Sequence, residues 1–415
     1  MKMSAVGVPA IPSLMREINE RRVIDTLRSN GALHAAEIAR LIGLSKPTTA
    51  DILRDLIDYG LIREVEPGEA DSKRARFVYE AISDVKVSLG IDIGTRFIRA
   101  AVGDLNLIMR AEVSIAVTSL KLNDLIKVIH QAVDKVLKDS GYKLRDVAAI
   151  AVGTPGVVDQ NTGIVSIAGT IGALDGINLA EIIRQEFGVY PTVENDINLV
   201  TVSEQTVGHG IGIDNFAVLS VGSGLGSGIV LNGKLHRGHR GAAGEVFYVP
   251  FGDPHDTHRG ATNPSGDRIS EITRELAKKY KKTTLVEPYT TYDIMKAAKD
   301  GDVLGRAVIE QEAERIALYV AAISAITDVE LVVLAGGIGR QADFFIEPIL
   351  KLVNEILPFP PRIEVSTLGE SGILVGALQI ATAQARDLVF QAQTAGNSTP
   401  LLANHINQSS ATGEL

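Results

Sequence analysis

The sequence contains no cysteine among its 415 residues. This absence excludes disulfide bonds, thiol nucleophiles and any zinc site that depends on cysteine ligands. No stretch approaches 18 uninterrupted apolar residues, and the first residues lack the apolar run of a signal peptide. We therefore expect a cytoplasmic protein that makes no use of a membrane. The length predicts two or three domains with a large core.

An excess of basic residues is also missing. The formal net charge is −9, from 41 basic and 50 acidic residues. Residues 1–83 hold 12 residues of each sign, so the whole acidic excess belongs to residues 84–415. We therefore do not expect this larger part of the chain to bind nucleic acid.

Residues 33–63 have the pattern of a helix-turn-helix. Apolar residues at helical spacing lead to Gly43, which can end a helix because glycine tolerates positive φ. Ser45 is a favourable N-cap for a second helix over residues 45–57, whose apolar face follows the spacing i, i+3, i+4, i+7. We expect this second helix to enter the DNA major groove. The residues predicted to face the DNA are Ser45, Lys46, Thr48, Ala50 and Arg54.

The flanking segments extend this pattern to a winged helix. Apolar residues within 14–27 predict a preceding helix, and the segments 61–65 and 77–79 predict a hairpin. Basic residues between these strands would contact phosphates or a narrow minor groove, namely Lys73, Arg74 and Arg76. An ordinary helical hairpin is the alternative for residues 33–63 taken alone. Because the module is electrically neutral, we expect it to bind DNA as a dimer with two half-sites.

The pattern changes after residue 83, where strand-like runs begin to alternate with long helical patterns. The expected strands include 148–152, 216–221 and 331–334, and the expected helices include 122–137 and 304–327. This alternation predicts an α/β domain. The polar, aperiodic residues 392–415 predict a disordered tail.

Two glycine-rich turns follow predicted strands. One contains Gly222, Gly224 and Gly226, and the other contains Gly336 and Gly337. Such turns expose backbone N–H groups to an anion such as phosphate, and they lie where α/β sheets bind ligands. The alternative is that these glycines only allow tight turns.

Residues 87–380 resemble the ROK family, which comprises repressors, sugar kinases and uncharacterised open reading frames. The matching segments occur in the family's order, and they are GIDIG at 90–94, GTPGVVD at 153–159, ENDIN at 194–198, GSGLGSG at 222–228, GE at 244–245 and LAGGIG at 334–339. Together with the winged helix in front, the resemblance covers about nine-tenths of the chain and points to the repressor branch. It implies a mainly α winged helix-turn-helix over 1–83. A two-lobed α/β domain of the actin-like, sugar-kinase (ribonuclease H-like) type would follow over 84–391, divided near residue 197.

The first phosphate loop departs from the pattern of the family's kinases, which read Asp-Ile-Gly-Gly-Thr-Lys. The aligned residues here are Asp92-Ile93-Gly94-Thr95-Arg96-Phe97, so a glycine and a threonine give way to larger side chains. The resemblance therefore implies that this turn no longer wraps a transferred phosphate. We interpret Gly94 and the later glycine turns as vestigial nucleotide loops, and we expect no catalytic residue and no cofactor.

The family's zinc site is also altered. Its Glu-x-Gly-His motif aligns with Glu245-Val246-Phe247-Tyr248, and the cysteines of its zinc loop are missing. The acidic and histidine residues of the loop, Asp253, His255, Asp256 and His258, could ligate a metal chemically, but their spacing matches no known metal motif. We expect no metal.

Asp196 aligns with the residue that acts as a base toward the sugar hydroxyl in the family's kinases. A carboxylate at this position can remove a proton or simply accept a hydrogen bond from a bound sugar. We interpret Asp196 as an acceptor in a sugar-binding site with Asn195 and Glu245, and Thr170 takes the place of the family's sugar-contacting asparagine. The alternative is that Asn195 and Asp196 only cap the following helix.

These expectations combine into a sugar-responsive transcription regulator, a repressor of genes for carbohydrate uptake or catabolism. It would bind operator DNA as a homodimer or homotetramer and release or retain it according to a sugar or sugar derivative. Two alternatives remain open at this point. One is an active ATP-dependent sugar kinase with a DNA-binding module, and the other is a regulator that answers to a protein partner through a degraded sugar pocket.

Overall fold

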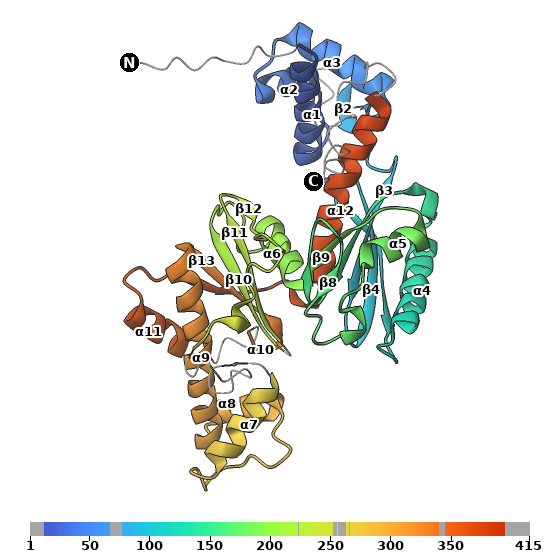
Figure 1. The fold of residues 1–415 in the computed structure, drawn as a ribbon. Coiled ribbons are helices and arrows are strands. Elements are labelled where there is room, and N and C mark those ends of the chain that lie inside the picture. Colours follow the sequence, from blue (N-terminus) through green and yellow to red (C-terminus); the bar gives the residue numbers. More distant parts are fainter. Residues whose placement is uncertain are drawn as a thin grey trace, which may run out of the picture.

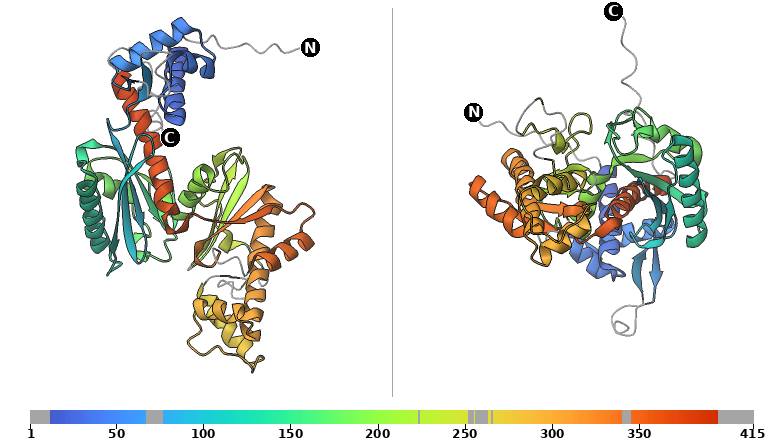
Figure 2. Two further views of the ribbon diagram at one scale, coloured as in Figure 1. Left: turned by 180° about the vertical axis from the view of Figure 1, so that it is seen from behind. Right: turned by 90° about the horizontal axis from the view of Figure 1, so that it is seen from below.

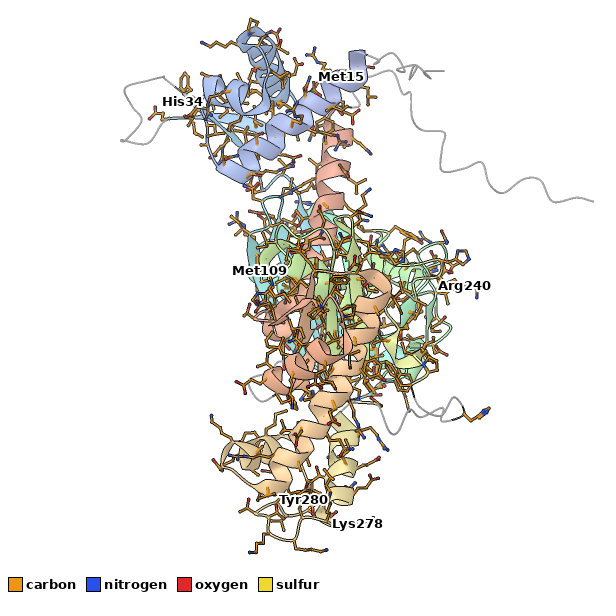
Figure 3. The ribbon with its side chains drawn as sticks, turned by 90° about the vertical axis from the view of Figure 1, so that its left-hand side faces the viewer. Met15, His34, Met109, Arg240, Lys278 and Tyr280 are labelled. Carbon is orange, nitrogen blue, oxygen red and sulfur yellow. The ribbon has the colours of Figure 1, made fainter. Side chains whose placement is uncertain are left out.

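The computed structural model describes residues 12–66, 77–222, 224–251, 255, 263–264, 266–339 and 345–394. A winged helix lies at one end of an elongated molecule, and a two-lobed α/β body forms the rest (Figure 1). Lys278 and Tyr280 of the second lobe mark the end that lies farthest from Met15 and His34 of the winged helix (Figure 3). The body therefore does not cover the side of the winged helix that points away from it.

The N-terminal domain confirms the winged helix-turn-helix. Its elements are α1 (Pro12–Asn30), α2 (Ala35–Ile42), α3 (Lys46–Asp58) and the antiparallel strands β1 (Ile62–Val65) and β2 (Val78–Ala81). Gly43 ends α2 with a φ of 73°, and the Ser45 hydroxyl caps α3 by accepting from the Thr48 N–H at 3.3 Å. Local sequence signals therefore determine both the turn and the start of the second helix.

The first lobe is built on a mixed sheet with the strand order β5-β4-β3-β6-β9. Its strands are β3 (Val87–Ile93), β4 (Phe97–Asp104), β5 (Met109–Ala116), β6 (Val147–Thr154) and β9 (Thr192–Asn195). Every residue of β3 is buried, because helix α4 (Leu122–Ser140) and helix α12 (Gly372–Thr394) cover opposite faces of the sheet (Figure 1). This central strand leads directly into the Gly94 turn at the cleft between the lobes.

The second lobe contains a sheet with the strand order β12-β11-β10-β13-β14. Its strands are β10 (Phe216–Val221), β11 (Leu225–Leu231), β12 (Lys234–Leu235), β13 (Leu331–Ala335) and β14 (Arg362–Val365). Helix α6 (Asp196–Val207) contacts this sheet and α12, whereas α7 (Gly266–Ala277), α8 (Thr291–Lys299), α9 (Val303–Thr327), α10 (Gly336–Gly339) and α11 (Ile346–Ile356) complete the lobe. The two mixed sheets confirm the predicted two-lobed architecture of the sugar-kinase type.

Short elements complete the description of the chain. They are β7 (Val157–Val158), β8 (Val165–Ser166), α5 (Leu179–Phe187) and the 3-10 turns η1 (Leu144–Asp146), η2 (Gly172–Leu174), η3 (Val246–Tyr248) and η5 (Gly369–Ser371). The first lobe carries most of these elements, while η3 and η5 lie beside the cleft.

Helix α12 returns from the second lobe, crosses the first and reaches the winged helix, as the view from behind shows (Figure 2, left). Gly376 permits its close crossing with α6, because a β-carbon there would overlap the backbone oxygen of Leu199. The segment Gly369–Thr394 is long and apolar enough to cross a membrane, but 56% of its apolar window is buried within the protein. It packs on β3, β6 and α6, which is the pattern of a core helix. Residues 392–394, expected in a tail, continue this helix.

Candidate functional site

The outer face of α3 forms the candidate DNA-binding surface. Thr49, Ile52, Leu53 and Leu56 are buried against the domain core, whereas Lys46, Thr48, Ala50 and Arg54 are exposed. The residues selected from the sequence are therefore all accessible on the second helix, outside its buried face. The basic residues of the wing, Lys73, Arg74 and Arg76, lie outside the described residues.

Three of these side chains already have partners. The Ser45 hydroxyl accepts from the Thr48 N–H and lies 2.8 Å from the Thr48 hydroxyl, so it serves the helix cap. Arg54 forms an ion pair with Asp51 at 3.3 Å on the exposed surface. A base or phosphate contact by Arg54 would have to replace this pair.

The second candidate site lies in the cleft, where the charges of two other carboxylates, Asp92 and Glu245, act on Asp196. Burial raises the pKa of Asp196 to about 7, and the nearby negative charges of Asp92 and Glu245 add to the increase. Burial also raises the pKa of Glu245. The structure thus brings together two residues of the predicted sugar site, Asp196 and Glu245, and adds Asp92.

Asn195 is the N-cap of α6, as the capping alternative predicts. Its side-chain oxygen accepts from the N–H groups of Ile197 at 3.0 Å and Asn198 at 3.3 Å, and its amide group donates to the Gly156 oxygen at 2.9 Å. A contact between Asn195 and a sugar stays a prediction, and it would have to share these groups. Asp196 is different, because its carboxylate accepts from local backbone N–H groups, that of Ile197 at 2.8 Å and its own.

The loop that carries Glu245 is held against the rest of the cleft. The Ser227 N–H donates to the Gly244 oxygen at 2.8 Å, and Arg237 pairs with the buried Glu194 at 2.6 Å. These contacts hold the segment before Glu245 against β11 and against Glu194, which lies two residues before Asp196. Thr170 is exposed in the turn after β8, and its proposed sugar contact stays a prediction.

Sequence reasoning missed an arginine that organises the first-lobe wall of the cleft. Arg99 donates to the buried Asp92 at 3.1 Å and to Glu370 at 2.5 Å. Burial raises the pKa of Asp92 to about 6, although Arg99 opposes this change. The hairpin register places Asp92 directly opposite Arg99 across β3 and β4, so a hairpin turn at 94–96 was the available signal.

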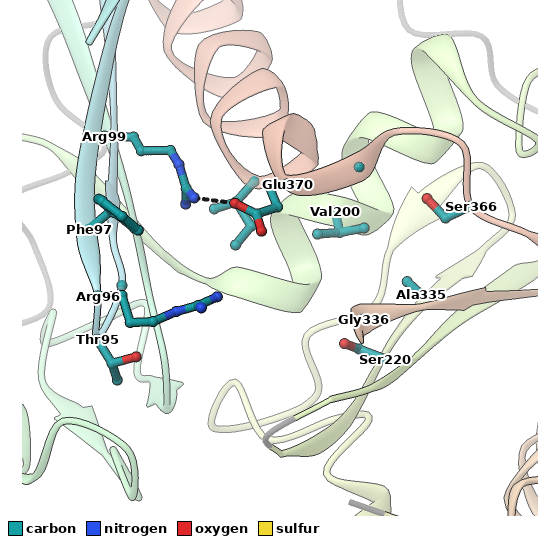
Figure 4. Close-up of a pocket in the computed structure, with 13 residues that line it drawn as sticks. Thr95, Arg96, Phe97, Arg99, Val200, Ser220, Ala335, Gly336, Ser366 and Glu370 are labelled. Atoms are coloured by element: carbon teal, nitrogen blue, oxygen red, sulfur yellow. Dashed lines mark hydrogen bonds and ion pairs between the residues drawn. The ribbon is translucent and has the colours of Figure 1, made fainter. Parts of the chain in front are cut away.

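A cavity of about 250 Å³ lies between the lobes beside this arginine (Figure 4). Gly94, Thr95, Arg96 and Phe97 line one wall, and Gly336 lines the other. Gly336 has a φ of 81°, and a β-carbon there would lie only 2.5 Å from the Val221 oxygen, so glycine is required. The altered phosphate loop and one of the later glycine turns therefore border the same space.

The remaining glycines of the predicted nucleotide loops are not among the residues that line this cavity. Gly222 adjoins the Gly336–Gly337 turn, with a hypothetical β-carbon 3.4 Å from the Gly337 nitrogen. Gly224 has open space beside it, and Gly226 faces Ile197. Their vestigial role stays a prediction.

The metal question rests on few described residues. Of the loop residues considered as ligands, only His255 is described, and it is exposed, while Asp253, Asp256 and His258 lie outside the described residues. The described ranges contain no group of three or more residues suited to hold a metal ion.

A cleft between two mixed sheets, joined to a winged helix, defines a class of protein with a sugar-kinase-like body and a DNA-binding module. The ROK family model matches residues 88–384, and the chain belongs to this family. A winged helix-turn-helix DNA-binding model matches residues 16–63.

Relatives share both parts of the chain. A xylose repressor from Caldicellulosiruptor bescii is 26% identical over 393 residues, which cover 88% of this chain and 96% of the relative. The DNA-binding transcriptional dual regulator NagC of Escherichia coli K12 is 25% identical over 347 residues, covering 81% of this chain and 84% of NagC. The crystal structure of a ROK family transcriptional regulator, a homologue of the E. coli Mlc protein, has a TM-score of 0.75 at 22% identity. It covers 92% of this chain and 99% of that structure, and at this identity the likeness shows the fold.

Proposed function

We propose that this protein is a sugar-responsive, DNA-binding repressor of genes for carbohydrate uptake or catabolism, acting in the cytoplasm. The observation that carries the proposal is a single helix, α12, that joins a carboxylate-lined cleft to a winged helix with an exposed recognition face. Relatives named as a xylose repressor and as NagC, which match along both domains, support the same function.

The effector would be a sugar held in the cleft by Asp196 and Glu245. Vicinal hydroxyl groups need fixed acceptors; Asp196 begins α6, and Glu245 directly precedes η3. Such a ligand switches the protein only if it binds the two states of the cleft with different affinity.

The route from cleft to winged helix follows α12. The cavity is lined by Ile373, in the first turn of α12, and by Gly369 and Glu370 of the preceding turn η5. Near the other end of α12, Asp387 pairs with Arg21 of α1, and the Arg21 guanidinium lies 4.3 Å from the centre of the Phe390 ring. A change in the cleft that moves α12 would therefore change the position of α1.

Operator binding would use two copies of the chain. The winged helix is electrically neutral over residues 1–83, so one copy offers little phosphate neutralisation. A homodimer or homotetramer would present two recognition helices to two half-sites.

An active sugar kinase is the second candidate, because Asp196 occupies the position of the family's base. Against it, Arg96 and Phe97 project from the turn that kinases keep small, and both line the cavity. A kinase requires ATP-dependent phosphorylation of a sugar, whereas the repressor function does not.

The proposed function is tested at Arg54. Arg54→Ala should weaken binding to the specific operator about tenfold, near the lower end of the roughly 1–3 kcal/mol of a base contact. The effect should be modest because Arg54 must first leave Asp51, with which it is paired. Fluorescence anisotropy with operator DNA and with a random duplex measures it.

The matched control is Arg63→Ala, which removes an exposed arginine paired with Glu80 in the wing strands. Its effect should be alike on the operator and on random DNA. An Arg54→Ala protein that loses the same affinity on both duplexes would show that α3 does not read the bases.

Sugar affinity should rise about tenfold between pH 6 and pH 8. The pKa of Asp196 is raised to about 7, so the carboxyl is mostly protonated at pH 6 and mostly ionised at pH 8. A ligand whose hydroxyl donates to the ionised form therefore binds more tightly as the pH rises. Calorimetry with D-xylose, D-glucose and N-acetylglucosamine at both pH values measures the change, and Asp196→Asn should remove most of it. An affinity that falls as the pH rises would instead identify the protonated acid as a donor.

A further inference from the structure

A group of positive charges lies at the end of the molecule farthest from the winged helix, where Figure 3 places Lys278 and Tyr280. Four lysines occupy residues 278–282 directly after α7, one more ends α8, and an arginine lies in the first turn of α9. We call this group the distal basic tip, and its members are Lys278, Lys279, Lys281, Lys282, Lys299 and Arg306. All six side chains are exposed, and within the described residues none of them forms an ion pair.

Hydrogen bonds join the segments that carry these charges. Asp302, the N-cap of α9, accepts from the Thr283 hydroxyl at 2.9 Å and from the Thr284 N–H at 2.6 Å. These bonds tie the lysine segment to the junction of α8 and α9. Arg306 lies at the same junction, because its guanidinium would be 3.4 Å from a β-carbon built at Gly301.

The charge of the distal basic tip is opposite to that of the rest of the chain. Residues 278–282 and 299–306 hold six basic and two acidic residues, a balance of +4, whereas the whole chain carries −9. The remaining residues therefore carry −13, since −9 less +4 is −13. An anionic surface is attracted to this end of the body and repelled by the rest of it.

Apolar and aromatic side chains lie beside these charges. Val303 directly follows Asp302 and is 55% exposed, and Val286, in the loop between α7 and α8, is 77% exposed. The Lys279 ammonium lies 5.7 Å from the centre of the Tyr280 ring. A nucleic-acid backbone offers little to an aliphatic side chain, whereas the interface of a bilayer accepts valine and tyrosine below lysines that reach the headgroups.

We propose that the distal basic tip binds the surface of an anionic lipid bilayer. This inference goes beyond the proposed function and does not depend on it. The lysines lie against the negative headgroups, and the two valines enter the headgroup region. The contact is peripheral, so it keeps the protein in the cytoplasm, but it departs from the expectation that no membrane is used. The winged helix, at the opposite end of the molecule, points away from the bilayer (Figure 3).

The test is co-sedimentation of the full-length protein with vesicles of phosphatidylcholine alone and of equal parts phosphatidylcholine and phosphatidylglycerol. At low ionic strength the wild type should bind the anionic vesicles at least about tenfold more tightly, and about 0.5 M salt should remove most of this preference. Glutamine at all four positions, Lys278→Gln, Lys279→Gln, Lys281→Gln and Lys282→Gln, should lower the affinity about a hundredfold or more. Each lysine at an anionic surface is worth roughly a factor of five.

A matched control removes four positive charges elsewhere on the body. It combines Lys121→Gln, Lys138→Gln, Lys143→Gln and Lys351→Gln, all of them exposed lysines without an ion pair in the described residues. This variant should keep the wild-type affinity for the anionic vesicles. Both lysine variants should bind operator DNA as the wild type does, which shows that they are folded.

A third variant separates a bilayer from a second nucleic acid. Val286→Ser combined with Val303→Ser should weaken vesicle binding about fivefold or more and leave the affinity for a random DNA duplex unchanged. A wild type that does not prefer anionic vesicles overturns the proposal, and so does an equal loss of vesicle binding in the two lysine variants. Vesicle binding that ignores the valines, together with random-duplex binding that depends on the four lysines of the tip, would assign the tip to a second DNA segment instead.

Discussion

Replacing Phe390 by alanine should lower the free energy of unfolding by about 3–5 kcal/mol, the usual cost of removing a buried aromatic ring. Phe390 is only 5% exposed and belongs to the hydrophobic cluster that joins α12 to the core of the winged helix. Its ring also lies 4.3 Å from the Arg21 guanidinium, so the substitution removes a cation–π contact as well. Urea unfolding followed by circular dichroism measures the loss.

The same substitution tests whether α12 transmits the state of the cleft. Phe390→Ala should bind sugar with the same affinity as the wild type. Operator binding by the variant should no longer change at the sugar concentration that saturates the cleft. Leu388→Ala is the control, since Leu388 lies on the same helix but is 50% exposed, and it should change stability by less than about 0.5 kcal/mol. If operator binding responds to sugar in the same way in both variants, Phe390 has no role in coupling the cleft to the winged helix.

The winged helix could be predicted closely from the sequence because its signals are local. The apolar spacing, Gly43 and Ser45 each act within a few residues, and the expected helix over 45–57 corresponds to α3, Lys46–Asp58. The strand expected at 216–221 coincides with β10 for the same reason, since a largely apolar run is bounded by glycine-containing turns.

The organisation of the cleft could be predicted only in part, because it depends on contacts between distant segments. Arg99 and Glu370 are 271 positions apart, and nothing near either residue reveals the other. The packing of α12 on the first lobe could not be predicted for the same reason. Its apolar residues predict a buried helix but do not identify the sheet against which the helix packs. The predicted division near residue 197 separates the strands of the first sheet from those of the second. It does not account for α12, which follows the second sheet in the chain but packs on the first.

Asn195 shows where a motif leaves two roles open. The sequence could not separate a sugar contact from a helix cap, because asparagine suits both. The hydrogen bonds to Ile197, Asn198 and Gly156 assign the cap to Asn195 and leave the neighbouring carboxylate with spare acceptor capacity. This difference makes Asp196 the better residue with which to test the sugar site.

Asp196→Ala should raise the sugar concentration needed to change operator binding by up to about a hundredfold. Removing the acceptor leaves a buried sugar hydroxyl without a partner, which costs about 1–3 kcal/mol. Binding to operator DNA without sugar should be unchanged, because the winged helix lies beyond the first lobe from this cleft (Figure 1). Anisotropy titrations of operator DNA, with and without the sugar that binds in calorimetry, measure both quantities.

Stability separates a sensing role of Asp196 from a structural one. Because burial raises the pKa of Asp196 above its ordinary value, the ionised carboxylate is disfavoured in the folded protein, and this cost is greatest above about pH 7. Asp196→Ala should therefore be as stable as the wild type at pH 8, or more so. Asn195→Ala removes the cap of α6 and should be less stable by about 0.5–2 kcal/mol. If Asp196→Ala instead unfolds as readily as Asn195→Ala and loses operator binding, Asp196 supports the fold, and the sensor must be sought elsewhere in the cleft.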